Sequence, residues 1–314
     1  MGWLIADIGG TNTRCAIAQP GGVVEKVETF RNREFPGLDR LLASYLGALP
    51  PSQRPDEAVI AIAAPIRGDE IHMVNINWAF SIATLARTLS LKRLIPLNDF
   101  AAQAYALPVL GPKDLRQVGG GTTVAGAPKV VVGPGTGLGT AGLVSIAGRW
   151  QAITGEGGHV TVAPSNEQET RIVALGRERF GHCSAERLIS GAGLMFIHGA
   201  LHGGPALAPD VFGARVAARD ADALETLDVF FQFLATIASN LALTFAAFGG
   251  VYIGGGITPR YVEQFLSSGF RPRFEDKGRY RPFLADIPTW VITADQPALR
   301  GLAAYAEAQA QAHA

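Results

Sequence analysis

Three apolar segments of this chain each end in a glycine turn, and this repeated pattern restricts the fold more than any other feature. The turns are Asp7-Ile8-Gly9-Gly10-Thr11-Asn12, Gly133-Pro134-Gly135-Thr136-Gly137 and Gly254-Gly255-Gly256. A short run of β-branched residues that ends in glycines predicts a buried strand followed by a tight turn. Such a turn lets backbone N–H groups approach an anion closely, although a plain hairpin gives the same pattern. The three turns are therefore candidate phosphate sites.

The arrangement of strands at the start of the chain occurs a second time. The expected meander strands are residues 3–8, 13–18 and 23–30, and then 129–132, 140–146 and 150–154. Further strands are expected at 58–66, 71–77, 94–97, 251–253 and 289–293, and helices at 38–49, 82–89, 100–106, 167–180, 185–200, 210–219, 224–248 and 297–310. Residues 271–281 read as a charged loop. Strands mixed with helices in both halves predict an α/β protein of two domains built on one plan.

Composition excludes several classes of protein. Hydrophobic residues make up 48% of the chain and charged residues 17%, which is typical of a globular protein with a sizeable core. Lys plus Arg and Asp plus Glu both number 27, so no net charge attracts nucleic acid or an anionic membrane. Only two cysteines are present, and the N-terminus has no signal-peptide pattern, so we expect a cytoplasmic protein.

One segment is long and apolar enough to raise the question of a membrane span. Residues 229–257 contain no charged side chain. Gln232, Ser239, Asn240 and the pair Gly249-Gly250 interrupt the segment, and its second part has the character of a strand. We therefore expect a buried core helix followed by a strand, and no membrane association.

Two motif matches are misleading. Residues 137–142 fit the dinucleotide fingerprint G-x-G-x-x-G, but Thr140 onward predicts a strand where the fingerprint requires a helix. His198 and His202 lie four apart on an expected helix without the glutamate of the zincin pattern, and we interpret them as core or surface histidines. The chain also has no P-loop sequence.

Asp7 is an acidic residue in an otherwise apolar strand, where a carboxylate is costly unless it is paired or near a cation. Thr11 and Thr136 add hydroxyl donors to the backbone donors of their turns. Two facing turns could grip a polyphosphate while Asp7 addresses a hydrated Mg²⁺. The alternative for Asp7 is a carboxylate that is hydrogen-bonded within its own turn.

A second set of polar residues lies at predicted strand ends and helix starts, where α/β folds build sites. The set is Asn98, Asp99, Glu156, His159 and Glu186. Amides, carboxylates and an imidazole suit a polyhydroxylated substrate, because each can hydrogen-bond to sugar hydroxyls. Asp99 could instead be the cap of the helix that begins there.

These segments together resemble bacterial glucokinase. The resemblance runs from end to end of the chain, in order, through Asp7-Ile8-Gly9-Gly10-Thr11-Asn12, Leu97-Asn98-Asp99-Phe100, Gly133-Pro134-Gly135-Thr136-Gly137-Leu138-Gly139, Gly155-Glu156-Gly157-Gly158-His159 and Ser184-Ala185-Glu186-Arg187, and Gly250–Ile257 is similar to the family's adenosine-side turn. It implies the two-domain actin-like (ribonuclease H-like, hexokinase-type) ATPase fold with a cleft between the domains. Residues 160–165 lack the cysteines of the related zinc-containing sugar kinases, which favours the branch without zinc.

The resemblance also implies roles for individual residues. Asn98, Asp99, Glu156, His159 and Glu186 would hold glucose, and Asp99 would take the proton from the 6-hydroxyl as that oxygen attacks the γ-phosphoryl group of ATP. Residues Ala6, Asp7, Ile8, Gly9, Gly10, Thr11, Gly135, Thr136, Gly137, Gly254, Gly255 and Gly256 would bind ATP, with Asp7 reaching Mg²⁺ through water. A small domain (1–108 with 298–314), a large domain (109–297) and a homodimer are expected. Another hexose, another phosphoryl donor, or a non-catalytic sugar sensor of the same fold are the alternatives.

Overall fold

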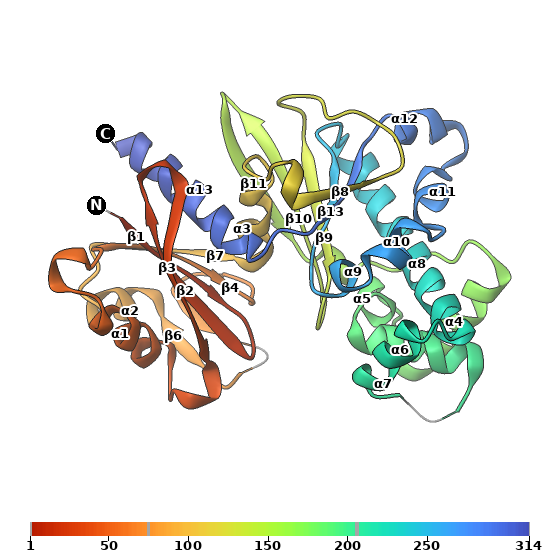
Figure 1. Ribbon diagram of the computed structural model, residues 1–314, viewed down its shortest axis with the longest axis horizontal. Helices are drawn as coiled ribbons and strands as arrows, with labels where there is room; N and C mark the ends of the chain where they lie inside the picture. The colour runs from red at the N-terminus through yellow and green to blue at the C-terminus, as the bar shows by residue number, and fades with distance from the viewer. Residues whose placement is uncertain (1, 74–75, 205–206, 314) are drawn as a thin grey trace. The chain divides into compact units, whose positions relative to one another are not determined.

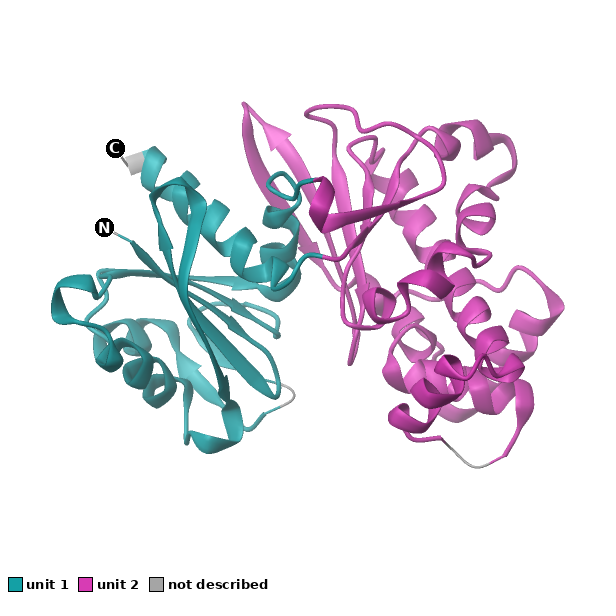
Figure 2. Ribbon diagram, in the orientation of Figure 1, with its two compact units in different colours: residues 1–111, 294–314 teal, residues 112–293 magenta. Residues whose placement is uncertain are grey.

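The structure is a computed structural model that describes residues 2–73, 76–204 and 207–313. The chain divides into two compact units (Figure 2), which we call unit 1 (residues 1–111 and 294–314) and unit 2 (residues 112–293). The divisions fall at 111/112 and 293/294, where the sequence suggested 108/109 and 297/298. Each unit contains its own central sheet.

The sheet of unit 1 has the strand order β3-β2-β1-β4-β7. Its strands are β1 (Trp3–Ile8), β2 (Asn12–Gln19), β3 (Val23–Arg31), β4 (Glu57–Ile62) and β7 (Arg93–Asn98). The first three form the expected antiparallel meander, and β4 and β7 extend the sheet in parallel to β1. A separate pair, β5 (Glu70–His72) and β6 (Ala79–Ser81), covers only the start of the strand expected at 71–77, and residues 74–75 of that strand lie outside the described chain.

Helices cover both faces of this sheet (Figure 1). They are α1 (Leu38–Ala48), α2 (Ile82–Thr88), α3 (Asp99–Ala106) and α13 (Pro297–His313), with 3₁₀ turns η1 (Pro20–Gly22), η2 (Asn32–Glu34) and η3 (Pro51–Gln53). Strand alternation divides β1 between the two cores: Leu4, Ala6 and Ile8 belong to the core with α1, and Trp3 and Ile5 to the core with α13.

Helices α3 and α13 pack closely against each other because glycine occupies the contact. A Cβ atom at Gly301 would lie 1.8 Å from the carbonyl oxygen of Ala102. No side chain fits that space, so glycine allows the two helix backbones to touch. The contact positions α3, which begins at the candidate site residue Asp99 and is preceded by the candidate site residue Asn98.

Unit 2 repeats the plan of unit 1. Its strand order is β11-β10-β9-β12-β13-β8. The strands are β8 (Leu115–Val118), β9 (Lys129–Pro134), β10 (Leu138–Ile146), β11 (Arg149–Gly155), β12 (Val251–Ile253) and β13 (Thr289–Ile292). Strands β9, β10 and β11 form an antiparallel meander, and β12 and β13 run parallel to β9, as β4 and β7 run parallel to β1. The expected duplication is confirmed, although β8 was not foreseen.

The helices of unit 2 surround one large core. They are α4 (Glu167–Phe180), α5 (Ala185–Leu188), α6 (Gly191–His202), α7 (Pro209–Ala217), α8 (Ala221–Phe245), α9 (Ile257–Arg260), α10 (Val262–Leu266), α11 (Phe270–Glu275) and α12 (Arg281–Ala285), with 3₁₀ turns η4 (Pro112–Asp114), η5 (Gly157–His159) and η6 (Gly278–Tyr280). Within the described residues, α8 is the one helix long and apolar enough to cross a bilayer, and 72% of its most apolar stretch is buried. Its side chains, such as Phe230, Phe231 and Phe233, fill the core, which fits the interpretation as a core helix.

The prediction of a charged loop at 271–281 is wrong for most of that segment. The chain forms α11, η6 and α12 there, and Arg271 is buried. The guanidinium of Arg271 donates to Glu275 at 2.6 Å and to four main-chain or hydroxyl oxygens, so its burial leaves no donor group unpaired in an apolar setting. The flanking Phe270 and Phe274 are fully buried and hold the segment to the core.

Candidate active site

In unit 1, two of the predicted site segments leave the same edge of the sheet. Ile8 of β1, Ile62 of β4 and Asn98 of β7 occupy one row across three parallel strands. The glycine turn after β1 and the pair Asn98-Asp99 therefore follow the carboxyl ends of strands that are two places apart, about 10 Å at the usual strand spacing. This edge is where open parallel sheets bind ligands.

Asn98, not Asp99, is the cap of α3. The side-chain oxygen of Asn98 accepts from the N–H groups of Phe100 at 3.0 Å and Ala101 at 3.3 Å. Asp99 occupies the first helical position and also accepts from Phe100 N–H at 3.0 Å. The positive end of α3 favours the ionised form of the Asp99 carboxyl group, and this is the form that can accept a proton.

Asp7 lies on β1 directly across from Arg14 on β2. The two side chains form an ion pair with a distance of 3.5 Å between Nη1 and Oδ2. Burial raises the pKa of the Asp7 carboxyl, and Arg14 opposes that effect. A carboxylate that burial disfavours gains from a nearby cation, and Arg14 supplies one here.

The turn after β1 is held by Asn32, a residue that the sequence did not single out. Asn32 is buried, donates its side-chain amide to Gly9 O at 2.8 Å, and accepts from the Thr13 hydroxyl at 2.8 Å. Its main-chain N–H donates to Thr11 O at 2.9 Å. These hydrogen bonds from Asn32 fix the carbonyl groups of Gly9 and Thr11 in the turn. Asn32 stands in a polar stretch that looks like any surface loop, so no sequence signal marked it.

In unit 2, the other two glycine turns adjoin each other. Val132 of β9 pairs with Ile253 of β12, so both turns leave the same sheet edge. Gly254 N–H donates to Val132 O at 2.9 Å, and Gly256 N–H donates to Pro134 O at 3.1 Å. Gly255 has a φ of +74°, and a Cβ there would lie 2.3 Å from Pro134 O. Glycine is required at this position for both reasons.

Glu186 also contacts the turn that follows β9. Its Oε2 accepts from Leu138 N–H at 3.0 Å, directly after Gly137. The first N–H of α6, from Gly191, donates to Gly135 O at 2.9 Å on the other side of that turn. A hollow of about 340 Å³ opens beside the turn, lined by Thr136, Arg179, Phe180, Glu186, Arg187, Ser190, Ala192, Met195 and Phe196.

Glu156 and His159 flank η5, which packs on the start of β10. A Cβ at Gly158 would lie 2.1 Å from Leu138 O, so the η5 backbone touches the same residue that Glu186 accepts from. Both side chains are exposed, and His159 Nε2 lies 3.8 Å from Glu156 Oε2. Unit 2 therefore gathers three of the predicted sugar-binding side chains around the first residues of β10.

The histidine pair on α6 belongs to the core. His198 is buried, and its Nδ1 lies 2.9 Å from the Thr226 hydroxyl on α8.

Across the described residues, no three His, Cys, Asp or Glu side chains gather as a metal cage. A divalent ion at Asp7 would accordingly take its other ligands from water and phosphate oxygens, as Mg²⁺ commonly does.

Each sheet has an antiparallel meander extended by two parallel strands, with glycine turns at its carboxyl edge, and this duplicated plan is that of the sugar kinases of the actin-like ATPase class. A family model described as Glucokinase matches residues 4–309. The glucokinase of Chromobacterium violaceum is 47% identical over 308 residues, covering 96% of this chain and 88% of the relative. The chain belongs to the glucokinase family, and its activity is the ATP-dependent phosphorylation of glucose.

Solved structures agree with this assignment. The crystal structure of a glucokinase from an Antarctic psychrotroph has a TM-score of 0.88 and 32% sequence identity, covering 97% of this chain and 98% of that one. A glucokinase of the ROK family from Streptomyces griseus, solved with glucose and AMPPNP, has a TM-score of 0.68 at 15% identity, covering 98% of this chain and all of that one. The second likeness concerns the fold alone.

Proposed function

We propose that the chain transfers the γ-phosphoryl group of ATP to the 6-hydroxyl of glucose, with Asp99 as the general base. The observation that carries this proposal is the row formed by Ile8, Ile62 and Asn98, which puts Asp99 on the same sheet edge as the glycine turn of β1. A carboxylate at a helix start can take the proton from a hydroxyl as the oxygen of that hydroxyl attacks a phosphoryl group, and ADP then leaves as the P–O bond to it breaks.

Each unit, taken by itself, supplies candidate ligands for the sugar. Asn98 uses its carbonyl oxygen to cap α3, so its amide NH₂ group is the part that would donate to a sugar oxygen. Glu156, His159 and Glu186 border the start of β10, where two carboxylates accept from hydroxyls and the imidazole can donate or accept. Membership of the glucokinase family supports glucose and ATP as the ligands of such a site.

ATP would be bound by the glycine turns at residues 6–11, 135–137 and 254–256. The N–H groups of Gly9, Gly135, Gly254 and Gly256 are already bonded to main-chain carbonyls and hold the turns in shape. The hydroxyls of Thr11 and Thr136 and the other N–H groups of these turns are the donors suited to phosphate oxygens. Asp7 fits Mg²⁺ through a water molecule, and the ion would neutralise charge on the phosphates when bound. Positioning by the turns, and not covalent chemistry, would then supply most of the rate enhancement.

The test is a panel of sugars and donors. Glucose, mannose, fructose and N-acetylglucosamine are assayed with ATP, GTP and polyphosphate at several Mg²⁺ concentrations, and the product is identified by ³¹P and ¹³C NMR. We expect glucose with ATP to give the highest kcat/KM, phosphate on the C6 oxygen, and no turnover without a divalent ion. A higher kcat/KM for another hexose or donor would replace the proposed substrates.

We further propose a cytoplasmic homodimer. The neutral net charge and the burial of α8 support the location, and membership of the family supports the dimer. Sedimentation velocity across a concentration series would give the mass of one chain, 33.1 kDa, if the protein were a monomer. A species of twice that mass at micromolar concentration is expected.

A further inference from the structure

Glu186 is in direct contact with the glycine turn that we assign to phosphate, and this contact joins two ligand sites inside unit 2. The Leu138 N–H group, at the end of that turn, points at Glu186 Oε2 with a distance of 3.0 Å. The same oxygen would lie 2.4 Å from a Cβ at Gly137. The glycine is therefore what allows the carboxylate to reach the turn.

The other supports of the turn come from backbone groups that no sugar would contact. Gly191 N–H donates to Gly135 O at 2.9 Å, and Gly256 N–H donates to Pro134 O at 3.1 Å. Glu186 is half-buried and stands on the short helix α5 between the turn and η5. Of the side chains proposed for the sugar, Glu186 is the one whose described hydrogen bond goes to the phosphate turn.

We infer that Glu186 is a positioning residue that couples sugar binding to nucleotide binding. The inference rests on the proposed function, because it takes Glu186 as a sugar ligand and residues 135–137 as a phosphate turn. Sugar hydroxyls that donate to Glu186 fix its rotamer and share its negative charge. The Leu138 hydrogen bond then holds the end of the turn in place, and ATP meets a turn that is already ordered and less repelled by the carboxylate.

The coupling has a definite sign. Ordering a side chain and a turn costs conformational entropy, and whichever ligand binds first meets that cost. The second ligand then binds more tightly, and linkage requires the same factor in both directions. We expect glucose to tighten the binding of the nucleotide by about five-fold or more, within the usual range of such couplings.

The decisive variant is Gly137→Ala. Its methyl group displaces Glu186 from Leu138 N–H and keeps every backbone N–H group of the turn, and the carboxylate can move because it is the far end of a flexible side chain. Gly199→Ala is the matched control: it lies on α6 of the same unit, outside the proposed ligand sites, and nothing lies within 4 Å of its Cβ. Glu186→Asp and Glu186→Gln form a second pair, because only Gln keeps the length needed to accept from Leu138 N–H.

The measurement is the Kd of AMPPNP with MgCl₂, by calorimetry, with and without saturating glucose. The ratio of the two Kd values should be about five-fold or more in the wild type and in Gly199→Ala, and below about two-fold in Gly137→Ala and Glu186→Asp. Glu186→Gln should retain more of the ratio than Glu186→Asp. Amide hydrogen exchange at Leu138, followed by NMR, should slow on addition of glucose in the wild type and not in Gly137→Ala.

Two failures can be told apart. A wild-type protein that binds AMPPNP but no glucose would overturn the proposed function and the coupling with it. A wild-type protein that binds both ligands, but with a Kd ratio near one, would overturn the coupling alone. So would an unchanged ratio in Gly137→Ala, because a coupling carried by other parts of the molecule would survive that substitution.

Discussion

Removal of Arg273 should strongly destabilise unit 2. Its guanidinium donates to both carboxylate oxygens of Glu169 on α4, at 2.5 and 2.6 Å, and to the Thr236 hydroxyl on α8 at 3.1 Å. The side chain of Glu169 is 1% exposed and that of Arg273 is 11% exposed, so solvent hardly screens the pair. The bond thus ties α4, α8 and α11 together.

The expected magnitude follows from the burial. Arg273→Met leaves Glu169 with its hydrogen bonds from Ser165 N–H and the Asn166 amide but without an opposite charge. Loss of one partner of a buried ion pair costs about 3–5 kcal/mol. The double variant Glu169→Gln with Arg273→Met removes the stranded charge, and it should recover more than half of that loss.

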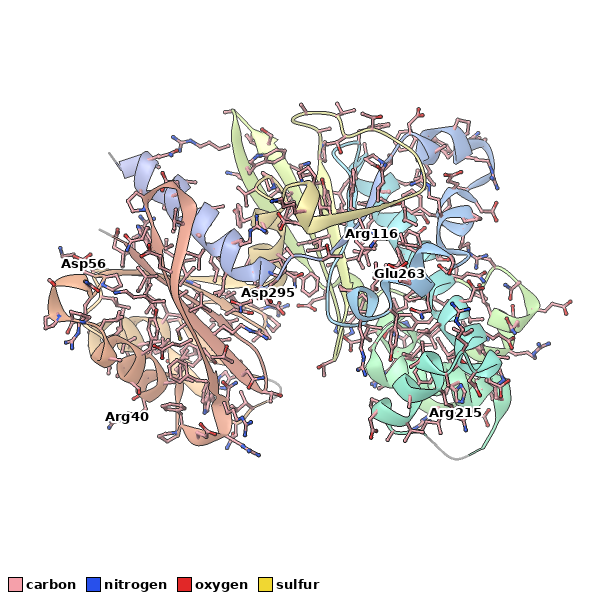
Figure 3. The ribbon with its side chains drawn as sticks, in the orientation of Figure 1. Arg40, Asp56, Arg116, Arg215, Glu263 and Asp295 are labelled. Carbon is pink, nitrogen blue, oxygen red and sulfur yellow. The ribbon has the colours of Figure 1, made fainter. Side chains whose placement is uncertain are left out.

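The control is an ion pair of the same residue types on the surface of the same unit. Arg116 and Glu263, labelled in Figure 3, lie 3.3 Å apart with side chains 49% and 71% exposed. Arg116→Met should therefore cost no more than about 1 kcal/mol. Urea unfolding followed by circular dichroism gives the free energies, and hydrogen exchange in α4 and α11 localises them. Equal losses in Arg273→Met and Arg116→Met would refute the reasoning.

Two further predictions concern the packing of the cores. Burial, and then the neighbouring His202, lower the pKa of His198 from its ordinary 6.5. The unfolded chain therefore takes up the proton first, and the free energy of unfolding should decline as the pH falls below about 6.5. His198→Gln should flatten that decline in a pH series of urea unfolding. Gly301→Ala should cost about 1–3 kcal/mol by forcing α3 and α13 apart. Gly47→Ala, on α1 with nothing within 4 Å of its Cβ, should instead gain up to about 1 kcal/mol.

Local patterns predicted the sheets, the duplicated plan and most helices, because they depend on neighbouring residues. The helix after Asn166 is an example: the spacing of Asn166 and Glu169 is that of a capping box, and Asn166 accepts from Glu169 N–H at 2.8 Å. The single helix expected at 185–200 is two helices, because α5 ends before Ile189 and Ser190 caps α6 by accepting from Gly193 N–H. The strand expected to reach residue 66 ends at Ile62.

The features that the sequence did not predict depend on residues that are distant in sequence. Arg271 and Arg273 looked like solvated charges, and only the fold brings Glu169 to one of them and the carbonyls of α12 to the other. Strand β8 has an ordinary polar sequence and forms because β13 offers it an edge. Asn32 supports the first glycine turn from a place 21 residues beyond Thr11, as the hydrogen bond between them shows.

The candidate site residues could be named from the sequence, because glycine turns and polar strand ends are visible there, and their roles stay a prediction. Its internal geometry was not predictable. Asn98 has the capping role that the sequence left open for Asp99, and Glu186 contacts the glycine turn after β9 as well as lying beside η5. Both facts depend on side-chain placement that spacing alone does not define.

The most direct test of the proposed mechanism is the single-turnover rate of phosphoryl transfer in Asp99→Asn, with the Kd of glucose measured on the same protein. Asp39→Asn is the matched control, because Asp39 also lies in the first turn of a helix and is exposed. If Asp99 is the base, the rate constant falls by roughly 10² or more while the Kd stays within several-fold, and the control is unaffected. An Asp99→Asn enzyme that transfers phosphate at near the wild-type rate would contradict the mechanism.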